Sequence, residues 1–125
     1  LLIVLAAVLG ACAGPQFRAE RFDDVALVYG RALAWSDFAK AYQLVTDEKT
    51  AAPFDEAGYQ QIKVTAYEPS PALPGGEPNT LKRRARLRYV LLTRMSERSL
   101  TTDEQWRYAE DEKRWYLQSG FPQFK

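Results

Sequence analysis

The sequence predicts an α+β domain in which two amino-terminal helices pack on a curved antiparallel sheet of about four strands. Apolar residues repeat with the 3.6-residue period of a helix as far as Val45, whereas they alternate with the period of a strand after Gly58. Since helices come first and strands joined by short turns follow, we expect the sheet to wrap around the helices.

The first eleven residues, LLIVLAAVLGA, are all apolar or small and carry no charge. The run is shorter than the roughly 20 residues of a membrane-spanning helix, and it ends in small residues. We therefore expect residues 1–11 to be the hydrophobic part of a secretory signal peptide whose start precedes Leu1. The alternative is a buried segment followed by a free core thiol.

The four residues Leu9-Gly10-Ala11-Cys12 resemble the lipobox of bacterial lipoproteins. The resemblance implies cleavage before Cys12 and acylation of its thiol and of the new amino terminus, which would anchor the protein to a membrane. Two or more acyl chains are needed because one chain alone holds a protein only marginally. Ala13, rather than Asp, follows the cysteine. This is similar to lipoproteins sorted to the outer membrane, so the resemblance implies a bacterial cell-envelope protein facing the periplasm.

The rest of the chain is expected to comprise a lipidated tether over residues 12–18 and one domain over residues 19–125, a length usual for a single core. The first helix is predicted over Ala19–Leu33, with Arg21, Asp24 and Arg31 turned away from its apolar face. Its apolar residues are Phe22, Val25, Ala26, Tyr29 and Leu33. A second helix is predicted to begin at Ser36 as N-cap, with Asp37 in its first turn and Phe38, Ala41, Tyr42 and Val45 on one face.

Strands are predicted after a connection over residues 46–58 that contains one short turn near Pro53. The first places Ile62, Val64 and Ala66 on one face. The longest is predicted over Leu81–Met95, after a Pro- and Gly-rich loop over Pro69–Thr80. Two further strands are expected over Thr101–Ala109 and Arg114–Gln118, separated by a polar turn.

The segment Arg31–Tyr42, RALAWSDFAKAY, and the final strand Lys113–Gly120, KRWYLQSG, resemble the nuclear transport factor two-like, or cystatin-like cone, superfamily. The similarity covers Phe17–Gly120 without a signature motif. It implies a cone of helices and curved sheet, and its members include both enzymes and non-enzymatic binding modules, so it does not select a function.

Several kinds of active site are excluded by composition. The chain has no His and a single Cys, which excludes His-containing triads, imidazole metal sites and an internal disulfide. No catalytic residue, metal or cofactor is predicted. The surviving enzymatic alternative is a carboxylate and tyrosine pair inside the cone, as in the isomerase branch of that superfamily. The candidate pocket residues are Asp37, Tyr42, Tyr59 and Tyr89, although each is also explained as a helix-start or core residue.

A basic row on the strand predicted over Leu81–Met95 is the most informative surface feature. Between Leu81 and Arg98 there are seven Lys or Arg and one acid, in a chain of net charge +1. The predicted binding surface is Lys82, Arg84, Arg86, Arg88 and Arg94. This surface would bind anionic lipid headgroups or an acidic partner protein. We prefer the alternative that Asp103, Glu104, Glu110, Asp111 and Glu112 neutralise it within the sheet, because that requires no partner. The predicted compartment disfavours nucleic acid.

The same strand is expected to expose Val90 and Leu92 on its outer face, next to Trp106 of the adjacent strand. Exposed apolar area of this kind marks association, so a homodimer or an envelope protein partner is expected there. The alternative is that the end of the chain, with Phe121 and Phe124, folds back over these residues. The sequence thus favours a non-catalytic binding or scaffolding lipoprotein over a small-ligand binder or enzyme.

Overall fold

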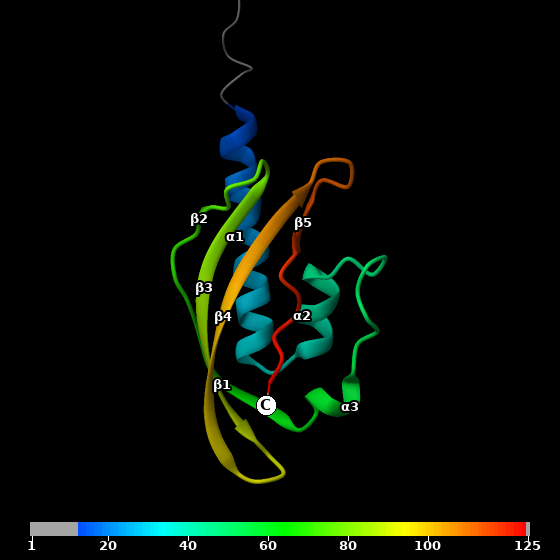
Figure 1. Ribbon diagram of the computed structural model, residues 1–125, viewed down its shortest axis with the longest axis vertical. Helices are drawn as coiled ribbons and strands as arrows, with labels where there is room; N and C mark the ends of the chain where they lie inside the picture. Colours follow the sequence, from blue (N-terminus) through cyan, green and yellow to red (C-terminus); the bar gives the residue numbers. More distant parts are fainter. Residues whose placement is uncertain (1–12, 125) are drawn as a thin grey trace, which may run out of the picture.

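The computed structural model describes residues 13–124, with side chains from residue 21, and it confirms the predicted α+β class. The helices are α1 (Ala13–Ala34), α2 (Phe38–Val45) and α3 (Glu56–Tyr59). The strands are β1 (Ile62–Pro69), β2 (Leu73–Pro74), β3 (Thr80–Leu91), β4 (Ser96–Ala109) and β5 (Arg114–Leu117). Figure 1 shows α1 and α2 beside a curved sheet. None of the helices in residues 13–124 is both long enough and apolar enough to span a bilayer.

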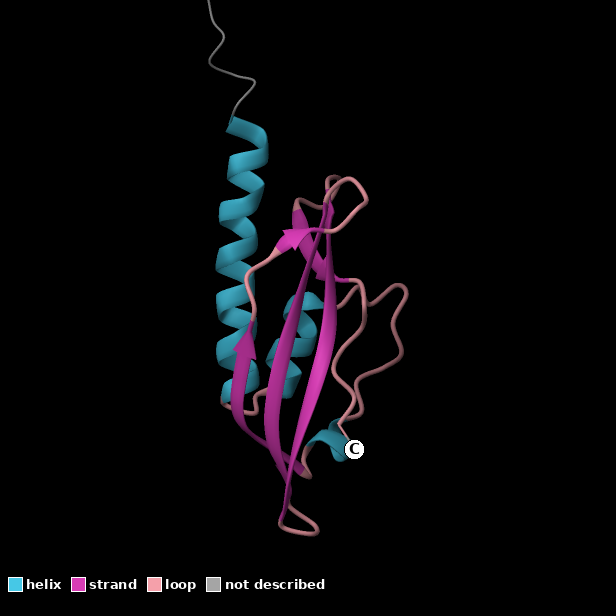
Figure 2. Cartoon of the chain, turned by 60° about the vertical axis from the view of Figure 1, so that its left-hand side comes forward, coloured by secondary structure: helices cyan, strands magenta, loops and turns pink. Residues whose placement is uncertain are grey.

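The sheet is antiparallel, with strand order β1-β3-β4-β5 and with β2 paired to the start of β3. Its centre is the long β3–β4 hairpin, in which Thr80 pairs with Arg107 and Leu91 with Ser96. β5 pairs only with Trp106–Ala109, at one end of β4. Figure 2 shows these two long strands curling along the helices.

Aromatic side chains fill the space between the helices and the concave face of the sheet. The Phe22 ring of α1 lies 5.3 Å from both the Trp106 ring and the Trp115 ring, and the Tyr29 ring lies 5.4 Å from Trp106. Leu33 and Val45 are fully buried in the same core. Burying such a side chain contributes about 1.5–3 kcal/mol, so the amphipathic faces of both helices stabilise the fold.

The junction between α1 and α2 differs from the prediction in one residue. Asp37, rather than Ser36, is the N-cap of α2, since its carboxylate accepts the Lys40 N–H at 3.3 Å. Ser36 has a φ of 59° and turns its hydroxyl toward β1, where it accepts the Val64 N–H at 2.9 Å. The prediction was wrong because Ser and Asp are equally good caps and only tertiary structure decides between them.

A β-bulge changes the faces of β1. The register with β3 shifts between Val64 and Ala66, so Val64 and Tyr67 lie opposite the inward residues Tyr89 and Leu87, whereas Ala66 lies opposite the outward Arg88. The expectation that Ala66 shares a face with Val64 was therefore wrong. A bulge inserts one residue and reverses the alternation after it.

Strand bounds also differ from the prediction. β3 ends at Leu91, and Arg94 lies in the turn to β4, where its N–H bonds to the Leu91 carbonyl at 3.1 Å. β4 begins earlier than expected, at Ser96, and the Pro- and Gly-rich loop contains β2. α1 begins at Ala13 and so covers most of the predicted tether.

The end of the chain packs between the helices and the concave face of the sheet. Phe124 contacts the rings of Tyr89 and Phe38 at 4.9 and 5.5 Å, and Phe121 contacts Tyr59 at 5.4 Å. It therefore closes the open end of the core rather than covering the outer sheet face. Trp106 is also fully buried on the concave side, which corrects the expectation that it lies beside Val90 and Leu92.

Candidate functional site

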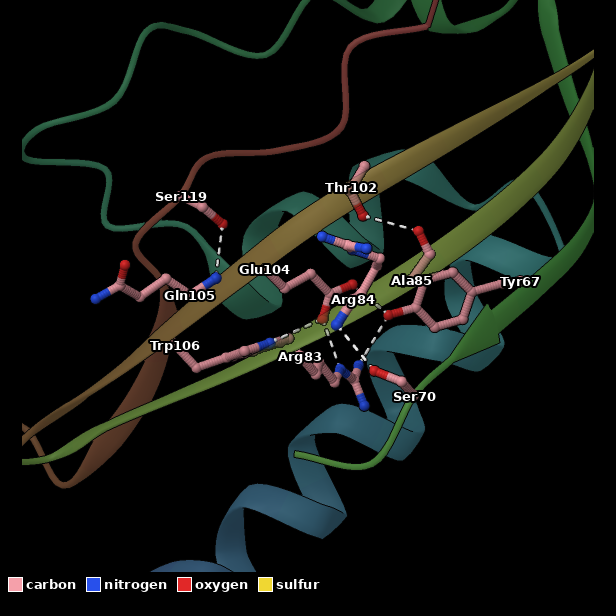
Figure 3. Close-up of polar contacts among 10 residues, drawn as sticks. All are labelled: Tyr67, Ser70, Arg83, Arg84, Ala85, Thr102, Glu104, Gln105, Trp106 and Ser119. Atoms are coloured by element: carbon pink, nitrogen blue, oxygen red, sulfur yellow. Dashed lines mark hydrogen bonds and ion pairs between the residues drawn. The ribbon is translucent and has the colours of Figure 1, made fainter. Parts of the chain in front are cut away.

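A buried polar cluster lies within the aromatic core, between β1, β3 and β4 (Figure 3). Glu104 accepts from Arg83 Nε at 2.6 Å, from Trp106 Nε1 at 2.9 Å and from the Tyr67 hydroxyl at 2.5 Å. Arg83 Nη2 also donates to the Tyr67 hydroxyl at 2.8 Å. The Arg83 and Glu104 side chains are only 8% and 3% exposed, so this ion pair is shielded from water.

Local structure brings these side chains together. Arg83 and Glu104 are directly opposite in the β3–β4 register, and Trp106 follows two residues later on the same face. The β-bulge in β1 turns Tyr67 inward toward them. The Arg83 guanidinium carbon lies 5.6 Å from the ring centres of both Phe22 and Trp106, so aromatic faces also surround the cation.

The polar groups of this cluster form hydrogen bonds with one another. Both Glu104 oxygens already accept hydrogen bonds, one of them in the ion pair with Arg83. A general base must instead be within reach of a substrate proton. The arrangement therefore holds one carboxylate as an internal acceptor and leaves it engaged with the protein's own donors.

The Tyr29 hydroxyl lies beside this cluster and is fully buried without a hydrogen-bond partner in the described part of the chain. Burial, strengthened by neighbouring Tyr67 and Glu104, raises the pKa of Tyr29 well above its ordinary value. Burial and the charge of Glu104 likewise raise the pKa of Tyr67, against the opposing effect of Arg83. Both phenols are therefore held neutral.

These shifts predict a loss of stability in alkali. The unfolded chain releases its tyrosine protons near pH 10, whereas the folded chain keeps those of Tyr29 and Tyr67. The stabilisation from the raised pKa values is therefore complete below pH 10 and falls as pH rises further. Absorbance at 295 nm should show Tyr29 and Tyr67 ionising only together with unfolding followed by circular dichroism. Their ionisation in the folded state, well before unfolding, would contradict this.

The structure brings only two of the four predicted pocket residues together. Tyr42 and Tyr59 line a cavity of about 580 Å³ between the α2–α3 connection, β5 and the end of the chain. Tyr42 donates to the Ala52 carbonyl, and Tyr59 donates to the Pro122 carbonyl at 2.9 Å. Asp37 is an exposed helix cap, and Tyr89 is buried against Phe124.

This cavity is lined by both aromatic and polar side chains. The Phe54 ring stacks on Tyr59 with centroids 5.2 Å apart, and the Phe121 ring lies 5.7 Å from the Tyr42 ring. Arg107 also lines the cavity, with its Nη2 4.0 Å from an Asp47 oxygen. The cavity therefore combines apolar surface with one loosely paired cation.

The predicted basic row lies on the outer face of β3, where Lys82, Arg84, Arg86 and Arg88 are all exposed. Arg84 pairs with Asp103 at 2.9 Å, and both side chains are largely solvated. Among the described residues, Lys82, Arg86 and Arg88 form no ion pair within 4.0 Å, although Glu68 lies opposite Arg86. Arg94 lies in the turn, outside the row.

Of the five acids predicted to neutralise the row, only Asp103 forms such a pair. Glu104 is buried with Arg83, Glu110 accepts from Asn79 at 3.3 Å, and Glu112 pairs with Lys49 at 3.1 Å. No ion pair is formed by Asp111 within residues 13–124.

The sequence analysis missed Tyr29, Tyr67, Arg83 and Glu104 as a group. One signal was available. Arg83 and Glu104 both fall in the apolar phase of their strands, and this alternation directs both side chains inward. A charged residue in a buried phase requires a partner of opposite charge.

No family model, curated protein or solved structure matches this chain. Among residues 13–124, no group of three or more acidic, His or Cys side chains is placed to hold a metal ion. Cys12 lies outside the described residues, so acylation at Cys12 stays a prediction.

Proposed function

We propose that this chain is a lipoprotein of the bacterial cell envelope, anchored through acylated Cys12 in the outer membrane and facing the periplasm. Its domain acts as a non-catalytic binding or scaffolding module. Support for the anchor comes from the sequence Leu9-Gly10-Ala11-Cys12 directly behind an uncharged apolar run.

The observation that carries the non-catalytic assignment is the set of hydrogen bonds that Glu104 accepts. Among the described residues, Glu104 is the buried carboxylate of the core, and it accepts from Arg83, Tyr67 and Trp106. A catalytic base must be free to accept a proton from a substrate, whereas Glu104 is engaged with the protein's own donors.

The exposed basic row supports a binding role, because three of its four cations form no ion pair within the described part of the chain. We propose that it contacts anionic lipid headgroups at the membrane that holds the anchor. Each Lys or Arg near such a surface contributes about 1 kcal/mol, and the contribution is screened by salt.

The test is the triple variant Arg84→Gln, Arg86→Gln and Arg88→Gln. It is made in the Cys12→Ser chain from residue 12 onward, so that neither acylation nor the apolar run over residues 1–11 holds the protein on the vesicles. Sedimentation with vesicles rich in phosphatidylglycerol should weaken by roughly 10- to 100-fold at low ionic strength, and by less at physiological salt. The melting temperature should change little, since exposed ion pairs contribute about 0–1 kcal/mol.

A matched control removes three exposed cations elsewhere: Arg31, Lys40 and Lys113, each replaced by Gln. It has the same net charge as the test variant, so equal weakening in both would show that only total charge matters. A test variant that melts lower yet binds as before would assign the row to stabilisation within the sheet.

The alternative function is a small-ligand binder. It is favoured by the cavity of about 580 Å³ that Tyr42, Tyr59 and Arg107 line. Native mass spectrometry of protein purified from envelopes would support it if a small molecule is retained and then lost when Tyr59 is replaced by Ala.

A further inference from the structure

One edge of β4 is open over half the length of the strand. β5 pairs with β4 only over Trp106–Ala109, and the chain after it reaches back no further than Gln105, whose carbonyl accepts from Gln118 N–H at 2.8 Å. From Ser96 to Asp103, no described residue pairs with β4 on this side. In Figure 1, β5 accordingly lies beside the upper part of β4 alone.

The direction of the free backbone groups follows from the hydrogen bonds at the end of β4 that pairs with β5. Gln105 N–H donates to Ser119 Oγ and its carbonyl accepts from Gln118, so both groups point to the open side. Tyr108 N–H donates to the Asn79 carbonyl and so points toward β3. The β3–β4 register has no shift, so the odd-numbered residues Glu97, Ser99, Thr101 and Asp103 direct N–H and C=O to the open edge.

Two hollows follow this edge on the concave side of the sheet. One, of about 620 Å³, is lined by Tyr89, Arg98, Ser99, Leu100 and Gln123. The other, of about 220 Å³, is lined by Tyr29, Thr102 and Glu104 together with residues of the terminal segment. Leu100 and Thr102 are two residues apart, which is the spacing of neighbouring side chains on one face of a strand.

The second hollow contains an unsatisfied polar group. Tyr29 and Glu104 both line this hollow, and the Tyr29 hydroxyl is fully buried without a partner among the described residues. A buried hydroxyl without a hydrogen bond destabilises the fold, and a polar group that bonds to it would remove this penalty.

We propose that the open edge of β4 binds an extended peptide segment of a partner protein by strand addition. The peptide backbone pairs with Glu97, Ser99, Thr101 and Asp103. One peptide side chain, apolar, enters the hollow at Leu100 and Tyr89. The side chain two residues away, which bears a hydroxyl, amide or amine, reaches the Tyr29 hydroxyl and Glu104. Backbone pairing supplies affinity in this mode, and the hollows supply specificity.

A second copy of this chain fits the edge less well in the register that pairs all four edge residues. Antiparallel self-pairing centred on Leu100 places Glu97 opposite Asp103 at both ends, and like charges directly opposite are destabilising. A peptide without acids at those positions avoids this repulsion. The inference names the kind of partner for the binding module proposed above, and in that sense it rests on the proposed function.

The experiment uses a displayed library of random nine-residue peptides selected on the full chain with Cys12→Ser. Selected peptides are expected to alternate, with an apolar residue two positions from a polar one. On binding, they should slow amide exchange at Glu97, Ser99, Thr101 and Asp103. Methylating alternate peptide nitrogens should abolish binding without any change to the protein.

Three variants locate the contacts. Thr101→Pro removes one edge N–H and should weaken binding at least tenfold, whereas Thr101→Val keeps that N–H and should bind within about twofold of the original chain. Proline is tolerated at a strand edge where the N–H faces solvent. Tyr29→Phe should weaken peptides with the polar residue several-fold and leave their apolar analogues unchanged.

Four results would overturn the inference: no peptide binding at 100 μM, equal binding by the Pro and Val variants, exchange protection away from β4, or the same amides protected by dimerisation without peptide. If the inference fails in any of these ways while the basic row still binds anionic vesicles, the proposed function stands without it.

Discussion

Replacing Arg83 with Met should destabilise the domain by about 3–5 kcal/mol, because it leaves the Glu104 carboxylate buried without its cation. Two hydrogen bonds to Glu104 would remain, from Tyr67 and Trp106, but neither donor carries a charge. Urea unfolding followed by Trp fluorescence measures this change in the free energy of unfolding. A loss of this size would be a large share of the 5–15 kcal/mol that stabilises a typical domain.

The neighbouring residue provides a matched control. Arg84 pairs with Asp103 in the same two strands but in solvent, so Arg84→Met should cost less than about 1 kcal/mol. The double variant Arg83→Met with Glu104→Leu should recover much of the loss, since buried ion pairs are often replaceable by apolar side chains. Equal effects of Arg83→Met and Arg84→Met would contradict the buried pair.

The elements were predictable because local periodicity determines them. Phe22, Tyr29 and Leu33 repeat along one face of α1, and the alternation in β3 and β4 is long enough to fix which residues point inward. The fold class and its order of helices and strands followed from these patterns.

The buried cluster required two further facts that periodicity does not contain. The bulge after Val64 reverses the faces of β1 and turns Tyr67 inward, which the alternation of Ile62, Val64 and Ala66 does not indicate. The opposition of Arg83 and Glu104 depends on the hairpin register, which is set by the turn after Leu91 rather than by either strand alone.

The end of the chain was harder to predict for a different reason. Phe121 and Phe124 are apolar residues in a segment without regular structure, so the sequence left open which apolar surface they cover. The structure places them against Tyr59 and Tyr89, where both also line the cavity that Tyr42 and Tyr59 share.

Replacing Cys12 with Ser should remove the membrane anchor completely, which is the largest effect expected of any single change in this chain. Each buried methylene of an acyl chain contributes about 0.8 kcal/mol to membrane binding. The binding free energy lost with two or three chains is therefore larger than the free energy that the exposed basic row could supply. The variant should accumulate as an uncleaved or mislocalised precursor, whereas the original chain should fractionate with the outer membrane. Recovery of the original chain only in inner membranes would contradict the predicted destination.

Metabolic labelling with an alkyne analogue of palmitate tests the anchor most directly. The chain is expressed behind an added initiator Met and basic residues, beside its Cys12→Ser variant and an Arg83→Met variant that retains Cys12. Label is expected on the original chain and on Arg83→Met, and none is expected on Cys12→Ser. Label that persists after Cys12→Ser, or an original chain that takes up none, would contradict the assignment as a lipoprotein.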